Sequence, residues 1–88
     1  MGTDPLTAGI AVFRLFQGAI RRAQTYEDIA RAKDQALAQL AQEREIADYQ
    51  QRAGVLNVRD SVRKRTRTLE AEQAVIALSE RLKKLIKK

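Results

Sequence analysis

The residues best able to do chemistry in this 88-residue chain are its clustered cations. Basic side chains crowded into one or two helical turns repel one another, so they favour a phosphate-bearing neighbour. No aromatic side chain is interleaved with them, so any contact with nucleic acid or anionic lipid is expected to be independent of sequence. The candidate contact residues are Arg59, Arg63, Lys64, Arg65, Arg67, Lys83, Lys84 and Lys87.

The charge of the chain is unevenly spread. Residues 55–88 hold ten basic and four acidic side chains, which accounts for the whole net charge of +6. A solvated helical face explains the same clusters, because Asp60, Glu70 and Glu72 lie near the first and a helix C-terminus favours the second. The sequence leaves both interpretations open.

Covalent and metal chemistry lack their usual residues. The chain has no cysteine and no histidine, which excludes thiolate and imidazole metal sites and histidine-based acid–base catalysis. Serine occurs only at Ser61 and Ser79, without a general base, and no phosphate-binding loop is present. We therefore expect no enzyme activity, no cofactor and no metal.

The first element is an apolar stretch, 6–20, in an expected helix over 5–24. Asp4 and Pro5 are typical of a helix start. About 15 residues span only ~22 Å of the ~30 Å hydrocarbon core, so this stretch is too short to cross a bilayer alone. It either packs in a protein assembly or lies at a lipid interface. The candidate membrane or subunit contacts are Leu6, Ile10, Val12, Phe13, Leu15, Phe16 and Ile20.

Two further helices are expected, over 26–53 and 58–87. Thr25 and Asp28 fit a capping box at the start of the second helix. Gly54 favours either the turn of a helical hairpin or a kink in one long helix. The third helix carries two apolar seams whose phase slips between residues 69 and 75. The candidate packing residues are Ile29, Ala36, Leu40, Ala47, Val62, Leu69, Val75, Leu78, Leu82 and Leu85.

These elements predict an all-α fold with two to three long helices in a single unit over 1–88. The apolar residues include many alanines and few aromatics, so a core of one chain is expected to be marginal. We therefore expect oligomeric packing to add stability. The parts are an apolar helix (5–24), a polar Ala/Gln-rich helix (26–53) and a basic helix (55–88).

The order of these features resembles the internal virion proteins, or ejection proteins, of short-tailed bacteriophages. The resemblance rests on Met1-Gly2-Thr3-Asp4-Pro5, the apolar stretch 6–20, the helix 26–52 and the basic stretch 59–67. It implies a protein located in the virion and then in the host cell envelope, which is released with the genome and helps to form a conduit for DNA.

The resemblance also implies partners, namely other copies of the chain, other virion proteins such as portal or tail proteins, the host membrane and DNA. Two alternatives from other classes stay open. The chain could be a soluble, cytoplasmic helical module that binds nucleic acid, or a coiled-coil adaptor with neither ligand.

Overall fold

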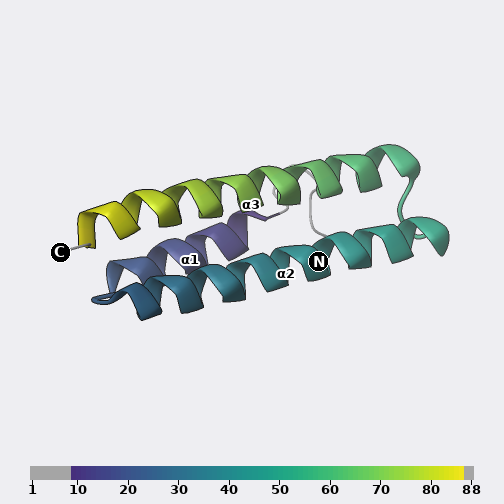
Figure 1. Ribbon diagram of the computed structural model, residues 1–88. Coiled ribbons are helices and arrows are strands. Elements are labelled where there is room, and N and C mark those ends of the chain that lie inside the picture. Colours follow the sequence, from purple (N-terminus) through teal and green to yellow (C-terminus); the bar gives the residue numbers. More distant parts are fainter. Residues whose placement is uncertain (1–8, 87–88) are drawn as a thin grey trace.

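The computed structural model of the protein describes residues 9–86, which form two long antiparallel helices and one short helix (Figure 1). The helices are α1 (Ile10–Arg21), α2 (Tyr26–Arg52) and α3 (Val58–Ile86). α1 lies along the half of the α2–α3 hairpin that is remote from the turn (Figure 1). The length of the hairpin makes the molecule elongated, with extents of 51 × 20 × 17 Å. The all-α prediction is confirmed.

Gly54 produces the turn between α2 and α3, which decides between the hairpin and the kinked helix. Its φ of 79° is left-handed, a region that glycine enters without a Cβ penalty. The N–H of Val55 donates to the carbonyl of Gln50 at 2.9 Å, and that of Gly54 donates to Gln51 at 3.1 Å. This pair of bonds is the Schellman ending of a helix, and it turns the chain back on itself.

α3 begins at a side-chain cap that follows the turn. The N–H of Asp60 donates to Oδ1 of Asn57 at 2.8 Å, so Asn57 satisfies one of the backbone donors that a helix start leaves unpaired. The turn and this cap together fix where α3 enters the hairpin.

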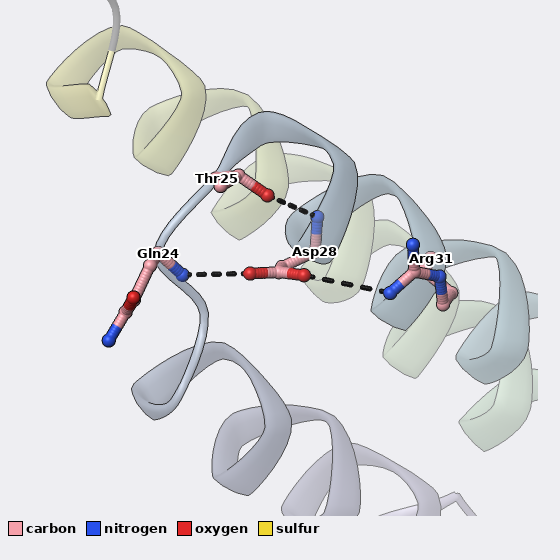
Figure 2. A network of polar contacts seen from close by, with 4 residues as sticks. All are labelled: Gln24, Thr25, Asp28 and Arg31. Carbon is pink, nitrogen blue, oxygen red and sulfur yellow. Dashed lines mark hydrogen bonds and ion pairs between the residues drawn. The ribbon is translucent and has the colours of Figure 1, made fainter.

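The start of α2 agrees with the predicted cap, and Figure 2 shows its contacts. The N–H of Asp28 donates to Oγ1 of Thr25 at 3.1 Å, and the N–H of Gln24 donates to the Asp28 carboxylate at 3.0 Å. A capping box usually returns its second bond to the N-cap residue itself, whereas here it reaches one residue earlier. The bond from Gln24 is the largest cause that lowers the pKa of Asp28, with Thr25 and the cation of Arg31 adding to it.

The start of α1 differs from the predicted helix over 5–24. Gly9 has a φ of 85°, which a right-handed helix cannot contain, so α1 begins at Ile10. Gly9 also lies close to α3, because a Cβ placed on it would come 3.1 Å from that of Ala71. The predicted cap at Asp4 and Pro5 lies outside the described residues.

The core forms where α1 lies in contact with the hairpin. Val12 and Phe16 are one helical turn apart and pack on Ala32 and Ala36 of α2. The small alanine side chains let the ring of Phe16 come close to the α2 backbone, and burying such a side chain contributes about 1.5–3 kcal/mol. The buried members of this cluster are Val12, Phe16, Ala32, Ala36, Leu40 and Val75.

Candidate interaction surface

The sequence of α3 contains three pairs of adjacent residues, and the pairs repeat every seven positions. In each pair the first residue is buried and the second is exposed. Seven residues make almost two full turns, so equivalent members of the pairs share a face. The first members are buried at 0% exposure, whereas the second members are 44–47% exposed. The pairs are Ser61-Val62, Thr68-Leu69 and Val75-Ile76.

The buried members are small or polar because α3 packs closely on α2. Oγ of Ser61 donates to the carbonyl of Ala47 at 3.3 Å, and Oγ1 of Thr68 donates to the carbonyl of Arg65 at 2.8 Å. A buried hydroxyl needs such a partner to offset the loss of its water. Ser79 is also fully buried, but its Oγ finds no partner among the described residues.

The exposed members continue to Val58 and form one apolar line, which we call the outer stripe: Val58, Val62, Leu69 and Ile76. Arg67, Ala71 and Ala74 line the groove between α3 and α1. At about 100° per residue, Leu69 lies roughly 140–160° around α3 from these three residues. The outer stripe therefore lies on the side of α3 that faces away from α1.

This arrangement corrects part of the predicted packing seam. Val62 and Leu69 each remain 47% exposed, because Ser61 and Thr68 occupy the inward positions one residue earlier. Leu85 is also exposed, at 75%. The phase slip predicted between residues 69 and 75 is the point where the larger apolar residues of the predicted seam change from the exposed face of α3 to the face that is buried against α2.

The other predicted packing residues lie inside the molecule. Leu78 is partly buried against the core cluster, and Leu82 is half-buried. The fully inward set is Ile29, Ala36, Leu40, Ala47 and Val75. The candidate packing residues predicted from the sequence include neither Ile76 nor Val58. The repeated pair at seven-residue spacing finds Ile76, and Val58 lies one helical turn before Val62.

The apolar residues of α1 divide in the same way. Val12 and Phe16 were expected to contact a membrane or another subunit, but both are buried against α2 within this chain. Ile10 and Leu15 are exposed, so they are the members of the predicted set with an accessible face. Phe13 and Ile20 are partly buried against the core, and Leu6 lies outside the described residues.

The first basic cluster is split by the fold. Arg65 turns toward α2, where Nη2 donates to Oε1 of Gln51 at 3.1 Å. Nη1 of Arg67 lies 3.2 Å from Oε1 of Glu70 on the same helix. The side chain of Lys64 is half-buried. The exposed members without an ion pair among the described residues are Arg59 and Arg63.

The second basic cluster lies near the far end of α3. Lys83 is half-buried, Lys84 is exposed, and Lys87 lies outside the described residues. The acidic side chains of Glu70 and Glu80 separate the two clusters along the helix. The structure therefore does not bring the predicted basic residues together into one patch.

Residues 9–86 offer neither a membrane span nor a cluster of metal ligands. None of the described helices combines the length and hydropathy that a membrane span needs. The described acidic residues form no group of three or more that could hold a metal ion. Among the described residues, the outer stripe is therefore the best candidate for an interaction surface. The interaction it offers is apolar contact with another helix.

Comparison of the chain with protein-family models, with curated proteins and with solved structures finds no match.

Proposed function

We propose that this chain is a non-enzymatic structural subunit that binds other protein helices along the outer stripe. The observation that carries the proposal is the exposure of Leu69 next to a fully buried Thr68. A single exposed leucine is common in proteins, but a line of large apolar side chains exposed along one helix favours a contact surface.

The dimensions of the outer stripe suit a helix as its partner. Val58 and Ile76 are 18 residues apart, which corresponds to about 27 Å along the helix axis. A coiled-coil seam has two apolar positions in every seven residues, and the outer stripe supplies one of them in each heptad from Val62 to Ile76. A line of this shape favours a helix over a small molecule.

The positions of the two serines support a non-enzymatic role. Ser61 and Ser79 are both fully buried between the long helices. A hydroxyl nucleophile must reach its substrate, so neither residue is placed for that reaction. Together with the lack of cysteine and histidine, this leaves binding as the better-supported role.

The N-terminal resemblance supports a virion as the place of this assembly. In this proposal the chain is an internal virion protein that associates with copies of itself and with portal or tail proteins. The burial of Phe16 within the chain favours protein contact over lipid contact for α1. Genes for portal, tail or lytic proteins beside its own gene would support this location, and a neighbourhood of unrelated metabolic genes would contradict it.

Sedimentation of the purified full chain tests the structural role. We expect a defined oligomer, or a defined complex with a companion protein, in the absence of lipid and DNA. Flotation with anionic liposomes and binding to a random-sequence DNA duplex are the control measurements. A chain that remains monomeric, forms no complex and binds only liposomes or DNA would contradict the proposal.

A second candidate, nucleic-acid binding, is favoured by Arg59 and Arg63. Both are exposed near the N-terminus of α3, where the helix dipole disfavours cations unless an anion is close. In this case DNA affinity should fall steeply with salt, since each phosphate contact releases counterions. Affinity that is unchanged between low and moderate salt would remove this candidate.

A further inference from the structure

The residues that border the outer stripe suggest what covers it. On the side toward α2, Arg65 and Glu72 are already held by Gln51 and Arg44 of the same chain. On the open side, a row of exposed residues repeats the spacing of the stripe: Arg59, Thr66, Gln73 and Glu80. This open row is basic at one end, uncharged in the middle and acidic at the other end.

The open row is complementary to itself when it is reversed. If a second helix of the same sequence runs antiparallel and is centred on Leu69, Val62 lies opposite Ile76 of the second copy. In the same register Arg59 and Glu80 of the second copy are offset by only one residue, about 1.5 Å along the axis, and the uncharged residues Thr66 and Gln73 are matched in the same way. In a parallel two-fold pairing the open row of one copy would instead lie beside the row of Arg65 and Glu72 of the other copy, so Arg59 and Glu80 would not face each other.

We propose that the outer stripe binds a second copy of this chain, α3 against α3, in an antiparallel two-fold dimer. This inference rests on the proposed structural role and names its partner. The two-fold arrangement is closed, because the same surface is used by both copies and no stripe is left over for a third. In this dimer the two α3 helices lie against each other and both α2 helices lie on the same side of that contact, because the inward positions of α3 are only about 100° around the helix from the outer stripe.

Substitution at the centre of the stripe gives the first test. Leu69→Asp places two carboxylates against each other at the two-fold axis, so we expect the dimer to weaken about 100-fold or more in sedimentation equilibrium. The monomer should keep its helical circular dichroism, because Leu69 is 47% exposed. Leu15→Asp is the matched control, since Leu15 is 67% exposed on α1, away from the stripe, and its substitution should leave the dimer unchanged.

The orientation has its own test in the charges of the open row. Glu80→Arg should weaken the dimer about five- to tenfold, because it sets arginine against arginine. Adding Arg59→Glu to that variant should restore the wild-type dimer, since the two charges are then exchanged. In a parallel dimer the double variant would restore nothing.

Cross-linking gives a direct reading of the direction, because the natural chain has no cysteine. The variants Arg59→Cys and Glu80→Cys are mixed in equal amounts and oxidised. We expect the mixed disulfide to dominate, and a majority of disulfides between identical variants would overturn the antiparallel arrangement.

The outcomes separate this inference from the structural role on which it rests. If wild-type chain and Leu69→Asp form the same oligomer, another face carries the assembly. The inference is then wrong, and the structural role stands without the outer stripe as its contact surface. If the wild-type chain is monomeric at every concentration but binds a companion protein, the second copy is likewise the wrong partner. If it forms neither, both proposals fail.

Discussion

Nη1 of Arg44 lies 2.6 Å from Oε2 of Glu72, and this ion pair joins α2 to α3. The two side chains are 26% and 20% exposed, so water screens the pair less than it screens a surface pair. The interface near it combines the apolar residues Leu40 and Val75 with the small or polar residues Ala47 and Thr68. An ion pair between fixed positions on the two helices favours one register of the hairpin.

Removing either partner of this pair should destabilise the protein. We expect Arg44→Gln or Glu72→Gln to lower the free energy of unfolding by about 1 kcal/mol, because each leaves a partly buried charge without its partner. A double-mutant cycle in chemical denaturation measures the coupling. The exposed pair Arg67–Glu70 is the control, with an expected coupling of about 0.3 kcal/mol; equal couplings for the two pairs would refute the role in register.

The three described glycines should respond differently to alanine. Gly54→Ala should cost about 1–2 kcal/mol, since a φ of 79° is left-handed while the added Cβ meets no atom within 4 Å. Gly9→Ala should cost more, because its Cβ also lies 3.1 Å from that of Ala71. Gly18→Ala, inside α1, should stabilise by about 0.5–1 kcal/mol. Thermal unfolding ranks the three variants, and a neutral Gly9→Ala would contradict the described start of α1.

The cap at Asp28 should give stability that depends on pH. Its pKa is lowered from 3.8 in the folded state, so the ionised carboxylate favours folding above that value, and this contribution disappears as the pH falls through the lower folded pKa. Asp28→Asn should therefore lower the melting temperature at neutral pH. The difference from wild type should shrink in acid below pH 3.8. A difference that is constant across this range would show that the charge is not responsible.

The two buried serines should behave in opposite ways. Ser61→Ala should cost about 1 kcal/mol, because it removes the donor to the carbonyl of Ala47. Ser79→Ala should be neutral or stabilising, because its buried hydroxyl has no partner among the described residues. Denaturant midpoints of the two variants are directly comparable, since both substitutions remove a single oxygen. Equal losses would show that Ser79 is hydrogen-bonded after all.

The helix over 26–53 and its cap at Thr25 could be predicted from local sequence, because their causes are local, whereas the cap at Asn57 was not predicted. Thr25 and Asp28 are three residues apart, and Gly54 determines its own backbone angle. The start of α1 could not be found in this way. The left-handed angle of Gly9 is favoured by its approach to Ala71, which lies 62 positions later in the numbering.

Which face of α3 is buried could not be predicted either, and the physical reason is a different one. Periodicity assigns the larger apolar side chains to the inside, and this rule selected Val62 and Leu69. Close approach of α2 and α3 instead selects small side chains such as Ser61 and Thr68 for the interface. The interruption of phase near residue 69 was the one local sign that two faces were present.

The partial cover that α1 gives the hairpin has a consequence for its motions. Among residues 9–86, α1 does not cover the part of the α2–α3 hairpin nearer the turn, and the interior of that part includes Ala47. Backbone amides there should open and exchange with deuterated water sooner than those beneath α1 (Figure 1). Because the outer stripe runs from this loosely held end into the covered half, docking of a second copy would slow exchange around Val62, far from α1. The end of the molecule whose backbone amides exchange fastest is therefore the end where dimer formation would slow exchange most measurably.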